Sequence, residues 1–298
     1  MKRRSIVLAL ILALLAPGLA LAADLPTAKP EQVGLSSERL ARITQVLRAD
    51  VERGRIPGAV VVVARKGRVA YVQAVGFRDK TAGTPMTPDA IFRIASMTKP
   101  IVTVAALSLY EEGRLLLADP VSKYIPALKT QTVGVERAPV EREMTIQDLM
   151  RHTSGLTYGN RGTAEIYKMY PESSNVSSLT LTMDEFILLN RGRLEGARVL
   201  GTKTVELMTS DHLGQISRGT NYFAGPGYTW GLGVSVREAN GLAPVAGTAG
   251  DYFWPGAFAT YWWADPKEEM VVVSMMQSPL GRHYIPLLRA LVLQAIVE

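Results

Sequence analysis

The stretch Arg93–Pro100, RIASMTKP, places a serine and a lysine three residues apart at the start of a long apolar run. If the run is a helix, Ser96 and Lys99 lie on one face with their Cβ atoms about 5–6 Å apart. Partial burial would disfavour the charged form of the lysine, and a neutral amine can take the proton of a serine hydroxyl and make it a nucleophile. The same spacing arises by chance on the order of once in a chain of this length. The spacing alone therefore leaves open a plain helix cap with a solvated lysine.

The segments around this stretch predict a helix, a hairpin and a second helix. Apolar residues recur at helical spacing between Ser36, a candidate N-cap, and Gly54, a candidate stop. Two β-branched runs, 60–64 and 69–75, flank a Lys66-Gly67 turn and predict a β-hairpin. The run from Ser96 to Glu112 predicts the second helix, with its apolar residues able to bury.

The middle of the chain predicts helices and loops. Thr145–Asp148 and Thr182–Glu185 resemble capping boxes, in which the first side chain and the fourth satisfy the free N–H groups at a helix start. The span 160–178 is polar and weakly periodic, which indicates a surface loop.

The last third returns to strands, predicted at 229–236, 258–263 and 270–276, and ends in an apolar helix at 287–297. A helix, a hairpin, a helical middle and returning strands predict the α+β class: an antiparallel sheet flanked by helices, with the first and last segments packed on one sheet.

Four longer stretches read PGAVVVVARKGRVAYVQAVGFRD, IFRIASMTKPIVTVAALSLYEEGRLLLADPVSKYIP, LMRHTSGLTYG and FWPGAFATYWWADPKEEMVVVSMMQ. Together they resemble the class C β-lactamase-like serine hydrolases of the penicillin-binding-protein-like superfamily, and particularly their carboxylesterase branch, and they keep the family's order. Ser-x-x-Lys is the nucleophile motif of that family. The resemblance favours the nucleophile interpretation of Ser96.

The resemblance implies roles for individual residues. Ser96 matches the acylated serine and Lys99 its proton-transfer partner. Trp254-Pro255-Gly256 matches the third motif, on a strand that lines the site as part of the substrate pocket. Gly256 is then expected to let the acyl group approach closely, and the N–H groups of Ser96 and Ala257 to form the oxyanion hole.

Trp254 also bears on the substrate. The β-lactamases of the family carry Lys at this place, where a cation can hold the carboxylate of a β-lactam or a peptide terminus. An indole offers apolar surface and a single N–H donor. We therefore expect small neutral esters of short or medium acyl chain, with a core role for Trp254 as the alternative.

One element of the family's pattern is missing. A catalytic Tyr, in a Tyr-x-Asn or Tyr-Ser motif, is expected after the Ser-x-x-Lys, and no such motif is found; Tyr158 belongs to the HTSGLTYG segment, which the family has in addition. Segments that are well separated in the family run together at Leu189-Asn190, which indicates an internal deletion of much of the helical lobe. Activity is then expected to be impaired.

The N-terminus resembles a secretory signal peptide over residues 1–22, with Lys2-Arg3-Arg4, a short apolar run and small residues at a cleavage site. We expect one hydrolase domain over 23–298, periplasmic or secreted, without a stable membrane span. Removal of the three basic residues lowers the net charge from +6 to +3, and no run of like charges predicts a nucleic-acid partner. The oligomeric state is left open.

Other functional classes fit less well. No Gly-x-Ser-x-Gly motif accompanies the three histidines, and His152 is predicted to be structural, beside Thr153 and Ser154. The chain has no Cys and no His-x-x-x-His pair, so neither a metal site nor a cofactor is predicted. The remaining alternatives are a β-lactamase, a penicillin-binding or DD-peptidase-like protein, and a catalytically inactive relative.

Overall fold

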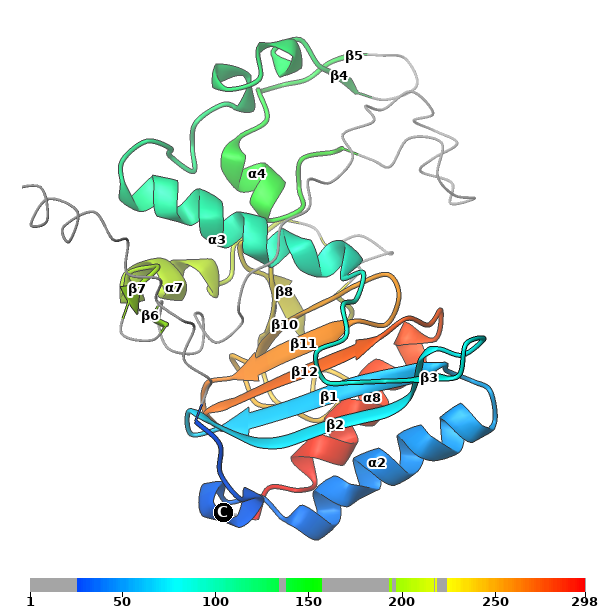
Figure 1. Ribbon diagram of the computed structural model, residues 1–298. Coiled ribbons are helices and arrows are strands. Elements are labelled where there is room, and N and C mark those ends of the chain that lie inside the picture. The colour runs from blue at the N-terminus through cyan, green and yellow to red at the C-terminus, as the bar shows by residue number, and fades with distance from the viewer. Residues whose placement is uncertain are drawn as a thin grey trace, which may run out of the picture.

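One antiparallel sheet organises the molecule (Figure 1). The computed structural model describes residues 26–133, 138–156, 193–194, 197–216, 218 and 224–297. The strand order in the main sheet is β3-β2-β1-β12-β11-β10-β9-β8, and each neighbouring pair is antiparallel. The strands are β1 Gly58–Arg65, β2 Arg68–Asp79, β3 Thr84–Pro85, β8 Tyr228–Trp230, β9 Ser235–Arg237, β10 Tyr252–Pro255, β11 Tyr261–Asp265 and β12 Met270–Met276.

The two ends of the described chain meet at the middle of this sheet. Strand β1 pairs with β12 from Ala59 opposite Met276 to Arg65 opposite Met270. Helices α2 Ser37–Glu52 and α8 Gly281–Leu293 pack together against one face of the sheet (Figure 1). The prediction that the first and last segments share one sheet is confirmed, because their apolar faces bury each other.

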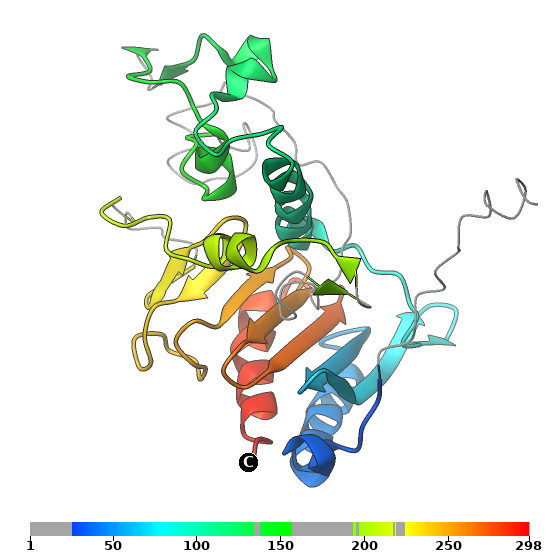
Figure 2. The ribbon, with the colours of Figure 1, turned by 90° about the vertical axis from the view of Figure 1, so that its left-hand side faces the viewer.

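The helical lobe lies on the opposite side of the sheet (Figure 2). Its longest helix is α3, Thr98–Glu111, and it also holds α4 Ile146–Met150 and α7 Thr202–Met208. A second apolar core joins this lobe to the sheet, with Leu107 and Trp262 among its fully buried members. The α+β class with an antiparallel sheet flanked by helices is thereby confirmed. The shorter elements are η1 Pro30–Val33, η2 Ala95–Met97, η3 Val121–Lys123, η4 Pro126–Leu128, β4 Thr132–Val133, β5 Ala138–Pro139, β6 Arg193–Leu194 and β7 Ala197–Arg198.

Three predicted elements have different bounds. The strand expected at 229–236 is the hairpin β8–β9, whose turn places Gly233 at φ +71°, where a Cβ would come within 2.3 Å of the Thr103 hydroxyl. The strand expected at 258–263 begins only at Tyr261, because Ala257–Thr260 form the turn from β10. The last helix begins at Gly281, six residues before the predicted start, and ends at Leu293.

Several predictions lie outside the described residues: the signal peptide, the loop at 160–178, the capping box at Thr182 and the junction at Leu189-Asn190. Within the part of the chain that is described, no helix combines the length and the hydropathy that a membrane span requires.

Candidate active site

Ser96 lies in the 3₁₀ turn η2, immediately before helix α3 begins. Both Ser96 and Lys99 are partly buried, and the Lys99 ammonium Nζ donates a hydrogen bond to the Ser96 hydroxyl over 3.0 Å. The predicted helix therefore starts with a tighter turn. This change favours the pair, since side chains at i and i+3 eclipse one another in a 3₁₀ helix.

The residue before the serine has an unusual backbone conformation. Ala95 has φ +49°, in the left-handed region that residues with a Cβ seldom adopt. Hydrogen bonds from the N–H groups of Met97 and Thr98 to the carbonyls of Ile94 and Ala95 close the turn around it. Backbone strain of this kind clusters at functional sites, where the surrounding structure enforces it.

The end of β10 is fitted against this turn. Strand β10 includes Trp254 and Pro255, and Gly256 follows it. The Gly256 N–H donates to the Thr260 carbonyl over 2.7 Å, and the Thr260 hydroxyl donates to the Ile94 carbonyl over 3.1 Å. A Cβ on Gly256 would come within 2.3 Å of that same Ile94 oxygen. The backbone just before Ser96 therefore packs closely against Gly256, and the approach of an acyl group to this glycine stays a prediction.

Replacing Gly256 by alanine is expected to destabilise the fold by at least about 1–3 kcal/mol, the usual effect of overpacking, and to reduce reaction at Ser96. The added methyl would lie 2.0 Å from the Thr260 hydroxyl, so the strand end must move away from the nucleophile turn. Urea unfolding and active-site labelling measure the two effects. Gly281→Ala is the control, because its Cβ would come no nearer than 3.3 Å to a neighbour. Wild-type stability and labelling in Gly256→Ala would contradict this role.

His152 lies beside the Ser96–Lys99 pair. Its ring stacks on the indole of Trp254 with centroids 4.9 Å apart and planes 5° apart, and it meets the indole of Trp230 at 4.6 Å. Burial, and then the charge of Lys99, lower the pKa of His152 to about 4. Its imidazole is therefore uncharged at neutral pH, although part of the residue remains open to solvent.

A buried carboxylate holds the turn that carries His152. Burial by itself would raise the pKa of Asp148, but hydrogen bonds from Arg142, the Thr145 N–H and Arg151 hold it well below its usual range. The hydroxyl of Thr153 also donates to this carboxylate. His152 itself has φ +60°, so this network maintains an unfavourable backbone conformation that aims the imidazole at the two indoles.

The remaining predicted residues lie as follows. Trp254 is only 3% exposed and its indole supports His152, and its place in a substrate pocket stays a prediction. Ala257 lies on the exposed turn directly after Gly256. The hydrogen bonds that close the two turns use the N–H groups of Met97, Thr98 and Gly256, and do not involve those of Ser96 or Ala257.

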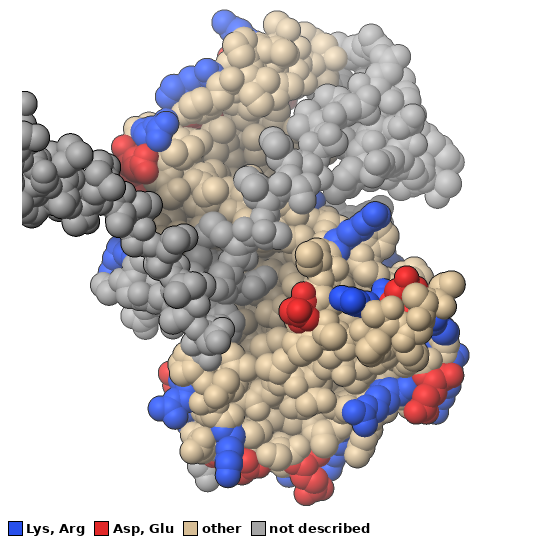
Figure 3. Space-filling model, in the orientation of Figure 1, with Lys and Arg blue, Asp and Glu red and all other residues tan. Residues whose placement is uncertain are grey.

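Sequence reasoning placed Ser96, Lys99 and Gly256 together, and missed Ala95, Thr260 and the position of His152. Only the HTSG context of His152 offered a signal, since a positive φ or a long-range hydroxyl contact has no pattern in a single sequence. Among the described residues, no group of three or more His, Asp or Glu is arranged to hold a metal ion. Lys and Arg side chains are scattered among Asp, Glu and uncharged residues on the face in Figure 3.

Comparison with known proteins shows which fold the chain has and which proteins it resembles in sequence. Residues 43–172 match the Beta-lactamase family. EstCE1, a hydrolase with promiscuous acyltransferase activity, superposes with a TM-score of 0.69 at 21% identity, covering 86% of this chain and 98% of that one. Simvastatin synthase LovD from Aspergillus terreus gives 0.64 at 16% identity, with the same shares covered. The chain has the fold of the β-lactamase-like serine hydrolases.

Two curated proteins are similar to the chain in sequence. Esterase EstB from Burkholderia gladioli is 36% identical over 49% of this chain and 36% of its own length. Protein Rv1367c from Mycobacterium tuberculosis is 25% identical over 78% of this chain and 88% of its own length. The chain is therefore similar to the Beta-lactamase family over residues 43–172 and to an esterase over about half of its length.

Proposed function

We propose that the protein hydrolyses carboxylic esters of short or medium acyl chain through an acyl-enzyme on Ser96. The 3.0 Å hydrogen bond between the Lys99 amine and the Ser96 hydroxyl carries the proposal, because it puts a proton acceptor within reach of the nucleophile. Similarity to an esterase supports the choice of substrate.

The steps follow from this geometry. Lys99 in its unprotonated form takes the Ser96 proton as Oγ attacks the ester carbonyl carbon, and the N–H groups of Ser96 and Ala257 hold the resulting oxyanion. The C–O bond to the alcohol then breaks, and the departing alkoxide receives the proton from Lys99. A water molecule then attacks the acyl carbon while Lys99 accepts a proton from it. The bond between the acyl group and Ser96 Oγ breaks, the acid leaves, and Lys99 returns the proton to Ser96.

The residues next to the pair favour a neutral substrate. Trp254 stands where the β-lactamases of the family carry lysine, and the pKa of His152, at about 4, leaves it uncharged at neutral pH. A hydrogen bond to a charged group is worth about 1.5–3 kcal/mol. The carboxylate of a β-lactam or cell-wall peptide would gain no such bond from a cation at either residue. Esters without a carboxylate need no such hydrogen bond, so their binding is not weakened by its absence.

Impaired turnover is part of the proposal. Within the described residues, no tyrosine hydroxyl bonds to Ser96 or Lys99. Tyr228 and Tyr261 bond instead to buried arginines, and desolvation raises the pKa of Tyr261 and Tyr252 well above the usual range. Proton transfer that rests on Lys99 and solvent can reduce turnover by up to about 10²–10⁴-fold.

We also propose an internal deletion near 189–190, which would account for the missing tyrosine. The alignment with Rv1367c spans 353 positions but includes only 78% of this chain, so a long stretch of that relative has no counterpart here. Restoring that stretch from a relative is expected to raise turnover if it carries the missing hydroxyl.

We also propose that the protein is exported by a signal peptide over residues 1–22. The basic start, the short apolar run and the small residues before Ala23 support this. Mass spectrometry of the protein from a periplasmic fraction is expected to find a chain that begins at Ala23. A full-length chain confined to the cytoplasm would contradict it.

Active-site labelling tests the enzymatic proposal. Purified protein is incubated with a fluorophosphonate, a p-nitrophenyl ester or a penicillin, and the adduct is located by peptide mass spectrometry beside Ser96→Ala. We expect a fluorophosphonate adduct on Ser96, ester turnover that Ser96→Ala abolishes, and little penicillin adduct. A penicillin adduct without ester turnover would identify a penicillin-binding protein, and no adduct on Ser96 would identify an inactive relative.

A further inference from the structure

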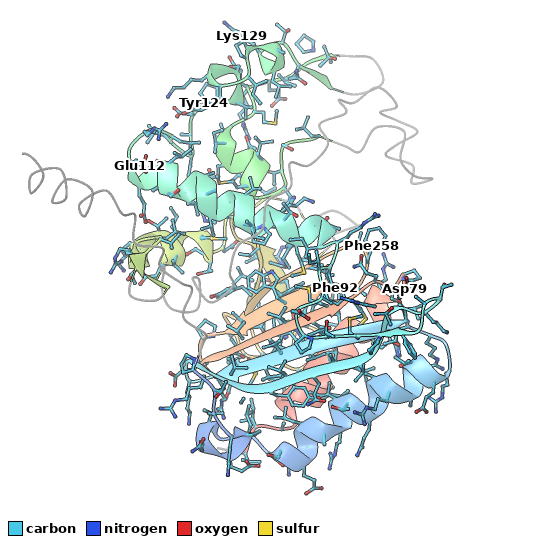
Figure 4. The ribbon with its side chains drawn as sticks, in the orientation of Figure 1. Asp79, Phe92, Glu112, Tyr124, Lys129 and Phe258 are labelled. Carbon is cyan, nitrogen blue, oxygen red and sulfur yellow. The ribbon has the colours of Figure 1, made fainter. Side chains whose placement is uncertain are left out.

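Apolar side chains remain in solvent where the sheet meets the start of α3. Ile91 is 101% exposed, Phe258 46% and Leu280 38%, and Phe92 is partly buried. Figure 4 shows Phe92 and Phe258 at this end of the molecule, near the first turn of α3. We call these four residues the apolar rim. Exposed apolar groups that gather in one place mark binding sites more often than scattered ones do.

Hydrogen bonds tie the three segments of the apolar rim to one another. The Gln277 amide donates to the Arg93 carbonyl over 3.1 Å, which connects the end of β12 to the segment of Ile91 and Phe92. The Ser278 N–H donates to the Phe258 carbonyl over 2.9 Å, which connects the Leu280 segment to the turn after β10. The rim is therefore one surface built from segments far apart in sequence.

The apolar rim is continuous with the candidate active site. Ile91 and Phe92 precede Ser96 by five and four residues. The carbonyl of Ile94, which lies between Phe92 and Ser96, accepts a hydrogen bond from the Thr260 hydroxyl. Phe258 directly follows Ala257, the second donor expected in the oxyanion hole. A substrate carbonyl placed between Ser96 and Ala257 thus has Phe258 next to one of its expected contacts and Phe92 four residues before the other.

The charged residues around the rim are of mixed sign. Asp89 and Arg93 are exposed on the segment before Ser96, and Arg282 is exposed at the start of α8. Such a border gives no preference for an anionic or a cationic ligand, so the attraction of this surface is for apolar groups. Each methylene that leaves water against it can increase binding up to about fourfold.

We propose that the apolar rim binds the aliphatic acyl chain of the ester and so sets the preferred chain length. This inference rests on the proposed esterase function, since it places the acyl group on Ser96. It assigns Phe258 and Ile91 as specificity-determining residues for the part of the substrate beyond the carbonyl carbon.

A chain-length series tests the inference, with p-nitrophenol kept as the common leaving group. The measured quantity is the ratio of kcat/KM for p-nitrophenyl octanoate to that for the acetate, at ester concentrations below micelle formation. Phe258→Ser and Ile91→Ser are compared with Leu116→Ser, a matched control whose leucine is 52% exposed after α3. Each rim variant is expected to lower the ratio at least about fivefold, and the control to leave it unchanged.

Each outcome decides between the two claims. Ester turnover by the wild type with the same ratio in all variants would overturn the rim and leave the esterase function standing. No turnover on any ester, acetate included, would overturn both. Light scattering shows whether Phe258→Ser splits a dimer. If the ratio changes only in a variant that loses the dimer, the rim is an interface between copies and the acyl site is overturned. Thermal melts of each variant show whether the fold is retained.

Discussion

Replacing Lys99 by methionine is expected to slow acylation of Ser96 by about 10²–10⁴-fold, the range for loss of a general base. Methionine keeps most of the length and apolar stem of lysine but cannot accept the Ser96 proton, and the 3.0 Å hydrogen bond is lost. The rate constant for labelling by a fluorophosphonate measures this directly, because it reports only the first chemical step.

The matched control is Lys123→Met. Lys123 pairs with Asp119 at the surface over 3.0 Å, on the segment after α3 and away from the nucleophile turn. Its loss is expected to leave the labelling rate unchanged, since exposed ion pairs contribute little. A labelling rate in Lys99→Met within threefold of the wild type would remove Lys99 from the mechanism.

The pH dependence of labelling tests whether His152 takes part in proton transfer. The pKa of His152 is about 4, so this imidazole is neutral in the folded state above pH 5 and cannot cause a change in rate between pH 5 and 8. The pH profile of labelling between pH 5 and 8 is therefore expected to be the same in the wild type and in His152→Phe, which keeps an aromatic ring against Trp254. A profile that changes in this variant would show that His152 takes part in proton transfer.

The elements with strong local patterns could be predicted from the sequence. Helix α2 is capped by Ser36, whose hydroxyl accepts the Arg39 N–H, and β12 covers Met270–Met276 as expected. The Thr145 capping box is present with both of its hydrogen bonds. In each case the deciding forces act within a few residues, through apolar periodicity or side-chain capping.

The details of the site could not be predicted, because they depend on contacts between distant segments. Ala95 has a positive φ next to Ile94, whose carbonyl accepts a hydrogen bond from the distant Thr260 hydroxyl. His152 lies beside Lys99 only because β8 and β10 supply two indoles. The motif Ser-x-x-Lys identified the residues, and the tertiary structure determines how they lie.

A second large effect is expected in the core on the other face of the sheet. Replacing Asp251 by asparagine should lower the free energy of unfolding by about 3–5 kcal/mol, the typical result of removing one partner of a buried ion pair. The fully buried Asp251 carboxylate accepts hydrogen bonds from Arg237 over 2.7 Å and from Arg289 over 2.8 and 3.2 Å. Asparagine would leave two buried guanidinium groups without a counter-charge.

This loss should also reach the candidate active site. Arg237 ends β9, Asp251 precedes β10 and Arg289 lies on α8. The Asp251 carboxylate therefore connects the neighbouring strands β9 and β10 to helix α8. Strand β10 carries Trp254 and leads to Gly256, and its position sets where the nucleophile turn can sit. A loosened β10 is therefore expected to slow labelling of Ser96 even while the protein remains folded.

Urea unfolding followed by circular dichroism measures the stability change, and fluorophosphonate labelling in the absence of urea measures the effect on the site. Glu112→Gln is the control, because its pair with Arg114 lies exposed at the end of α3 (Figure 4) and should be dispensable. If Asp251→Asn unfolds at the same urea concentration as the control, the buried pairs do not hold this core. If it is destabilised but labels at the wild-type rate, the network stabilises the fold without positioning β10.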